Sequence, residues 1–165
     1  EFTVNIALIH NNSPIMGAIY VPATEELYFA MTGLGSYKIS RGLLIDSLDN
    51  LISESFKLPC SYKRENHVIV GSRSHMSEET QAFFEEKRKE YGDIEIMAVG
   101  SSLKLCMVAE GKADAYPRYA PTMEWDTAAG HAIAKFAGFS IKKYNSSQDL
   151  VYNKEDLLNP WFLVS

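Results

Sequence analysis

The sequence predicts an α/β fold in which an antiparallel meander of strands is followed by a layer of alternating strands and helices. Two observations support this class. Residues 2–39 hold short runs of strand-forming residues separated by turn residues. From residue 67 onward, short apolar runs alternate with longer stretches at helical spacing. The 165 residues are enough for a sizeable core, because chains of this size bury roughly 70% of the surface that their unfolded state exposes.

Four strands are expected in the meander. The first covers Phe2–Ile9, where apolar residues alternate with Thr3 and Asn5. Its apolar face holds Phe2, Val4, Ile6 and Leu8. The turn-forming residues 10–14 precede a second strand at Ile15–Val21, and the third and fourth are expected at 27–31 and 36–39.

Residues 40–60 give a weaker pattern, which fits a short helix or a loop with helical character that Pro59 closes. This stretch is the expected joint. We therefore predict that residues 1–40 belong to the sheet of an N-terminal domain and that 67–165 form a C-terminal α/β domain. Residues 41–66 are predicted to form the segment that connects the two.

The second half is expected to alternate strand and helix. The strands are predicted at 67–70, 94–99, 114–119 and 139–142, with parallel pairs among them. Ser77 is the expected N-cap of a helix that reaches Gly92. A second helix is expected at 102–110, and a third follows Thr122 as its N-cap and ends at Gly138. The buried stripe of this third helix is predicted to hold Trp125, Ala129, Ala132, Ile133 and Phe136. The tail from residue 145 is expected to be mostly loop.

The composition excludes several classes of protein. The net charge of −5 and the lack of a basic stripe argue against a nucleic-acid duplex as partner. No apolar run approaches the roughly 18–20 residues that span a bilayer. The two cysteines, Cys60 and Cys106, lack a metal-ligand spacing and are expected to be reduced thiols. We expect a cytoplasmic protein, and peripheral association with the inner membrane stays open.

Two segments place charged residues at the start of predicted helices. Gly100–Lys104 offers Ser101, Ser102 and Lys104, and Trp125–Gly130 offers Asp126. A helix start presents unpaired amides and partial positive charge, which suits a phosphate. Lys104 in a first turn opposes the helix dipole, and a bound phosphate would reverse that penalty. The alternatives are a solvated lysine and serines that only cap the helix.

Asp126 has two interpretations. It is either an acidic residue that favours the positive end of the helix dipole or an oxygen ligand for magnesium.

Ser72 and His75 follow one strand and Arg118 ends another, where α/β sheets bind ligands. A polar loop and a surface arginine are the alternatives. His131 is expected to be packed or solvated.

Together these segments resemble a known family. Gly100–Lys104, Val108–Asp114, Tyr116–Arg118 and Trp125–Gly130 are similar to the C-terminal half of bacterial 3′(2′),5′-bisphosphate nucleotidases of the CysQ type. These belong to the inositol monophosphatase superfamily of metal-dependent, lithium-sensitive phosphatases. The resemblance covers nearly the whole chain, is weakest at residues 40–65, and implies the C-terminal part of an inositol-monophosphatase-like sandwich.

The resemblance also implies a reaction. Family members hydrolyse the 3′-phosphate of 3′-phosphoadenosine 5′-phosphate to AMP and phosphate, which clears a by-product of sulfate assimilation, with magnesium as cofactor. Asp126 then matches a metal ligand that also faces the substrate. The substrate-binding residues that the resemblance implies are Ser72, His75, Ser101, Ser102, Lys104 and, more weakly, Arg118.

One departure from the family is large. Family members carry an N-terminal portion with a metal-binding glutamate and an Asp-Pro-(Ile/Leu)-Asp-Gly-Thr motif, which supply most metal ligands and activate the water. We interpret the chain as a C-terminal fragment that holds no catalytic residue and has little phosphatase activity alone. Open strand edges are expected to favour a homodimer. The alternatives are an inositol or sugar-phosphate phosphatase of the same superfamily and a non-catalytic nucleotide-binding remnant.

Overall fold

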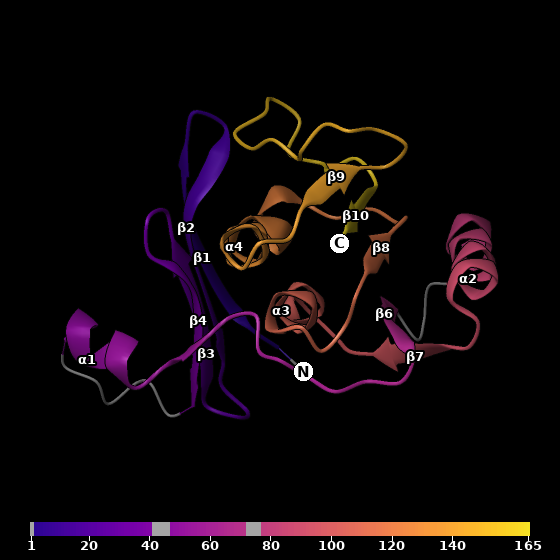
Figure 1. Ribbon diagram of the computed structural model, residues 1–165. Coiled ribbons are helices and arrows are strands. Elements are labelled where there is room, and N and C mark those ends of the chain that lie inside the picture. Colours follow the sequence, from indigo (N-terminus) through magenta and orange to yellow (C-terminus); the bar gives the residue numbers. More distant parts are fainter. Residues whose placement is uncertain (1, 41–46, 72–76) are drawn as a thin grey trace.

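The computed structural model describes residues 2–40, 47–71 and 77–165 (Figure 1). Within these ranges, the first part of the chain forms a five-stranded antiparallel sheet in the order β1-β2-β3-β4-β5. The predicted meander is confirmed, and a short fifth strand follows helix α1 (Leu48–Ser53). The strands are β1 (Val4–His10), β2 (Ser13–Val21), β3 (Glu26–Met31), β4 (Gly35–Ser40) and β5 (Phe56–Lys57).

The rest of the chain alternates strands and helices as predicted. Its helices are α2 (Glu78–Tyr91), α3 (Leu103–Glu110) and α4 (Glu124–Phe136). Its strands are β6 (His67–Gly71), β7 (Ile94–Ala98), β8 (Tyr116–Arg118), β9 (Ile141–Lys143) and β10 (Phe162–Val164). β6 and β7 are parallel, whereas β8, β10 and β9 form an antiparallel sheet in that order. The expected parallel pairing therefore holds for only part of this layer.

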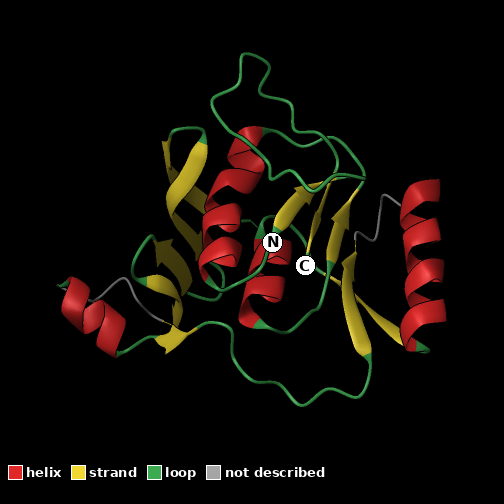
Figure 2. Cartoon of the chain, turned by 45° about the horizontal axis from the view of Figure 1, so that its top comes forward, coloured by secondary structure: helices red, strands yellow, loops and turns green. Residues whose placement is uncertain are grey.

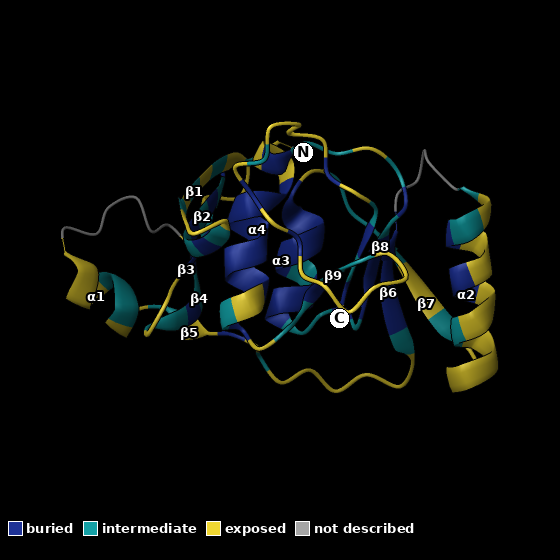
Figure 3. Ribbon diagram, turned by 90° about the horizontal axis from the view of Figure 1, so that it is seen from above, coloured by how far each residue is buried: buried dark blue, intermediate teal, exposed yellow. Residues whose placement is uncertain are grey.

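The elements stack in layers. Helices α3 and α4 lie between the five-stranded sheet on one side and β6, β7 and β8 on the other, with α2 outermost (Figures 1 and 2). The backbone of β2 comes very close to α4, because a Cβ at Gly17 would lie 2.4 Å from the Ala129 carbonyl oxygen. Gly130 makes similar room for Leu105 of α3. One hydrophobic core joins residues of β2, β3, β6, α3 and α4, and most residues of both α3 and α4 are buried (Figure 3).

Several predictions about single residues are confirmed. Ser77 caps α2 through a hydrogen bond from the Thr80 amide, and both cysteines are free. His131 is buried. Among the helices in the described ranges, none is long and apolar enough to cross a membrane. The division into residues 1–40, 41–66 and 67–165 stays a prediction.

Two predictions about α4 are wrong, each for a physical reason. The N-cap of α4 is Met123 rather than Thr122, because the Asp126 carboxylate accepts a hydrogen bond from the backbone amide of Met123. Trp125 is 60% exposed, so it does not belong to the buried stripe. The tail from residue 145 is mostly loop, as predicted, and holds one short strand, β10. Phe2, Val4, Ile6 and Leu8 share one face, as predicted, and this face points away from the core, because all four are at least half exposed.

Candidate active site

The two helix starts singled out in the sequence are joined directly. The Ser102 hydroxyl precedes α3 and donates a hydrogen bond of 3.1 Å to the backbone carbonyl of Asp126 in the first turn of α4. Ser102 is the N-cap residue of α3, but its side chain makes no capping bond to that helix. The hydroxyl instead holds the starts of α3 and α4 together, which places Lys104 and Asp126 in one region.

The Ser101–Lys104 turn has an unusual backbone. Ser101 has a φ of 54°, in the left-handed region that costs energy for a residue other than glycine. Lys104 is only 8% exposed. Its Nζ donates to the Ser101 carbonyl at 3.2 Å and lies 5.8 Å from the centroid of the Tyr116 ring. The turn therefore holds a largely buried ammonium at the start of a helix.

Asn5 of β1 and Thr3, which directly precedes β1, support this turn and were not among the predicted site residues. Asn5 donates to the Ser102 hydroxyl at 2.7 Å, and the hydroxyls of Thr3 and Ser101 are 2.8 Å apart. The Asn5 carbonyl oxygen Oδ1 is buried without a hydrogen-bond partner among the described residues. Their position in the sequence could have indicated this role, because both polar residues alternate with apolar ones in the predicted first strand.

Asp126 is exposed and only partly engaged. Its Oδ2 accepts a hydrogen bond of 2.8 Å from the backbone amide of Met123, which fixes the carboxylate at the first turn of α4. Asn159 braces the same turn from the tail, because its Nδ2 donates to the Met123 carbonyl at 2.8 Å and to the Thr127 hydroxyl at 2.9 Å. The carboxylate suits one position of a magnesium site. Within residues 2–40, 47–71 and 77–165, no group of three or more acidic, histidine or cysteine side chains is arranged to hold a metal.

Arg118 ends β8 near the same region. Its Nη2 donates to the Pro121 carbonyl at 3.1 Å, and its Nε is buried without a partner in the described part of the chain. Burial raises the pKa of Tyr116 to about 12, opposed by the nearby Arg118 guanidinium and reinforced by Asp126. Tyr116 thus lies within electrostatic reach of both charged groups.

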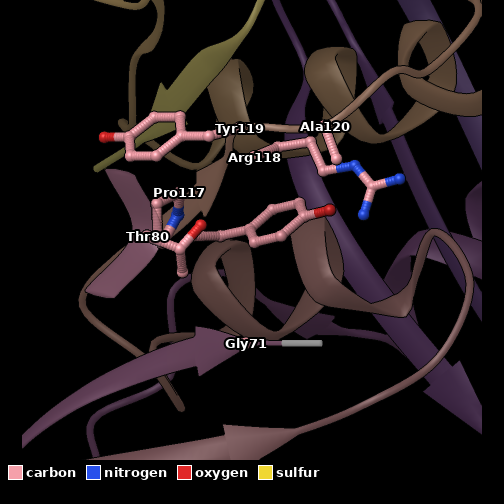
Figure 4. A pocket seen from close by; sticks show the side chains of 7 residues that line it. Gly71, Thr80, Pro117, Arg118, Tyr119 and Ala120 are labelled. Atoms are coloured by element: carbon pink, nitrogen blue, oxygen red, sulfur yellow. The ribbon is translucent and has the colours of Figure 1, made fainter. Parts of the chain in front are cut away.

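A small pocket lies beside Arg118, between the end of β6 and the end of β8 (Figure 4). Its lining includes Gly71, Thr80 and Tyr116. Ser72 and His75, two of the predicted substrate-binding residues, lie outside the described residues. The structure therefore brings together Ser101, Ser102, Lys104 and Asp126, with Arg118 close by.

Comparison with known proteins identifies the family. The model of the inositol monophosphatase family matches residues 1–161. A crystal structure of CysQ from Bacteroides thetaiotaomicron, described as a bacterial member of that family, is 51% identical. It superimposes with a TM-score of 0.94 and covers 100% of this chain and 62% of that one.

Curated relatives give the same result. The 3′(2′),5′-bisphosphate nucleotidase CysQ of Salmonella typhimurium is 35% identical over 172 residues, which cover all of this chain and 60% of the relative. A Staphylococcal inositol monophosphatase structure at 20% identity and a TM-score of 0.72 shares the fold. The chain spans about 60% of the length of the CysQ proteins it matches. By sequence and by structure, this chain is a CysQ-like member of the inositol monophosphatase family.

Proposed function

We propose that this chain is the substrate-binding part of a magnesium-dependent nucleotidase that hydrolyses 3′-phosphoadenosine 5′-phosphate to AMP and phosphate. The observation that carries the proposal is the hydrogen bond between Ser102 and the start of α4. It brings a buried lysine, a helix start and an exposed aspartate to one place, which suits a phosphate ester bound beside a metal ion. The nucleotidase activity named for the CysQ relatives supplies the substrate class.

Each residue has a proposed role. Lys104 and the amides of the Ser101–Ser102 turn bind one phosphate, and Arg118 binds the other through its guanidinium. Asp126 supplies one magnesium ligand and keeps its position through the Met123 amide. When bound, magnesium polarises the phosphoryl group and lowers the pKa of a coordinated water. The remaining ligands are proposed to correspond to the part of the CysQ relatives that lies outside the matched region.

The first experiment measures binding of 3′-phosphoadenosine 5′-phosphate to the purified chain by calorimetry, with inositol monophosphate as the comparison ligand. Arg118→Met is expected to weaken binding at least about tenfold, because charge-assisted hydrogen bonds contribute about 1.5–3 kcal/mol each. Lys104→Met is expected to do the same. The matched controls are Arg88→Met and Lys89→Met, which alter exposed residues of α2. Circular dichroism verifies that each variant folds.

Phosphate release with and without magnesium completes the test. We expect this chain to bind the nucleotide and to release little phosphate from it. Binding of inositol monophosphate in preference to the nucleotide would contradict the substrate class. Binding that survives both Arg118→Met and Lys104→Met would contradict the site. Efficient magnesium-dependent release that lithium suppresses would show that the chain holds more of the metal site than Asp126.

A further inference from the structure

A second cavity lies away from the candidate active site. It is a groove of about 410 Å³ between α2 on one side and β8, β9 and β10 on the other. Phe83 of α2 lines one wall, and Tyr119, Lys143, Tyr144 and Leu163 line the opposite wall. Sites for small molecules commonly have volumes of roughly 300–1,000 Å³, so the groove has the size of a ligand site.

The base of the groove is aromatic. Tyr119 is only 6% exposed, and its ring centroid lies 6.2 Å from that of Phe83 and 4.6 Å from that of Tyr144. Tyr144 is 38% exposed, so part of its ring remains open to a ligand. The Tyr119 hydroxyl has no hydrogen-bond partner among the residues that the structure describes. A flat ring in this groove gains stacking contacts, and a polar atom on it can pair with the phenol.

The charges around the groove favour an anion. Three lysines and two glutamates line it, although the whole chain carries a net charge of −5. Lys87 is paired with Glu86 and Glu90, and Lys142 is paired with Asp149. Lys143 instead donates to the neutral amide oxygen of Gln148 at 3.0 Å. In the described part of the chain, its charge is therefore not balanced by a carboxylate.

The groove opens on a different side of β8 from the candidate active site, although Tyr119 also lines the small pocket beside Arg118. Arg118 and Tyr119 are consecutive residues at the end of β8, and their side chains extend in opposite directions (Figure 4). Arg118 extends toward the loop that precedes α4, where its guanidinium donates a hydrogen bond to the Pro121 carbonyl. Tyr119 extends toward α2 and the turn after β9, where it meets Phe83 and Tyr144.

We propose that this groove is a second ligand site, which binds a planar aromatic molecule with an anionic group, of the kind represented by a purine mononucleotide. The ring stacks on Tyr144 beside Phe83, and the Tyr119 hydroxyl pairs with a polar atom of the ring. The anionic group lies against Lys143.

Trp161 provides a direct readout. Its ring centroid lies 5.8 Å from that of Tyr144 and 6.1 Å from that of Tyr119. The chain has two tryptophans, and the other, Trp125, is exposed beside the candidate active site. In a Trp125→Phe background, the emission of Trp161 therefore reports on the groove alone. AMP is the probe, and adenosine is the comparison ligand without the phosphate.

AMP is expected to change Trp161 emission in a saturable way. Tyr144→Ala should raise the Kd for AMP about tenfold, in line with the loss of a stacking contact to a base. Lys143→Gln should also raise the Kd for AMP about tenfold and leave the response to adenosine unchanged. Lys89→Gln, an exposed lysine on α2 outside the groove lining, serves as the control and should match the parent chain.

Arg118→Met separates the two sites. The proposal requires that this variant keeps the AMP response of Trp161, whatever becomes of binding at the candidate active site. A response that Arg118→Met abolishes and Tyr144→Ala leaves intact would overturn the proposal, because AMP would then bind only at the active site. A Trp161 signal that does not respond to AMP would overturn it as well. Neither result would contradict the nucleotidase proposal, which is tested by its own substrate and variants.

Discussion

Protonation of His131 should destabilise the protein. His131 lies in α4, and its Nδ1 is 2.9 Å from the Tyr152 hydroxyl in the buried core. Burial lowers the pKa of this imidazole from 6.5 to about 4, and the positive charge of Lys135 acts in the same direction, while Asp149 opposes it. A histidine that is neutral in the folded state must take up a proton on unfolding at mildly acidic pH.

The size of the effect follows from the two pKa values. The unfolded chain binds the proton more tightly, so the stability due to neutral His131 is complete above pH 6.5 and falls as the pH drops toward 4. The full difference is about 3 kcal/mol, at roughly 1.4 kcal/mol for each unit of pKa. Between about pH 7.5 and pH 5.0, the loss amounts to about 2 kcal/mol of unfolding free energy.

Urea unfolding at these two pH values tests the calculation. We expect His131→Gln to lose about 2 kcal/mol less than the parent chain on acidification, because glutamine does not titrate. His10→Gln, which alters an exposed residue at the end of β1, is the control and should behave like the parent. The carboxylates of Glu110 and Asp114 have lowered pKa values, so their contributions fade only at lower pH and cancel between variants. An equal loss in His131→Gln and the parent would refute the reasoning.

Two further predictions concern the five-stranded sheet. Gly17→Ala should lower the unfolding free energy by about 1–3 kcal/mol, because the new Cβ would collide with the Ala129 carbonyl of α4. Ala18→Val, on the opposite face of the same strand, should change it by less than about 0.5 kcal/mol, and equal melting curves for the two variants would contradict the packing argument. The exposed apolar residues of β1 should make the chain associate, so light scattering is expected to show dimers or larger species that Ile6→Lys reduces. A monodisperse parent chain would contradict this prediction.

The sequence was most informative where the pattern was long. The predicted meander and the helices α2 and α4 were found because each repeats a strand or helix period several times. β10 was missed because three residues are too few to show a period. Trp125 was misplaced because large aromatic residues are usually buried, whereas its position in the first turn of α4 turns it outward.

The candidate site was predictable in part. Ser101, Ser102, Lys104 and Asp126 stand at helix starts, which the sequence marks. The bond from Ser102 to the Asp126 carbonyl and the support from Asn5 depend on residues 24 and 97 positions apart. Such pairings follow from the packing of β1, α3 and α4, and a single sequence does not contain that information.

The two sides of β1 differ in a way that makes its register essential. Thr3 and Asn5 contact the Ser101–Ser102 turn, while Val4 and Ile6, between and beside them, face outward. Because side chains alternate along a strand, inserting or deleting one residue would exchange the two sides. Apolar groups would then meet the Ser101–Ser102 turn, and the asparagine would face away from it. This strand should therefore tolerate changes of residue type far better than changes of length, and its spacing is as much a part of the site as the residues that contact it.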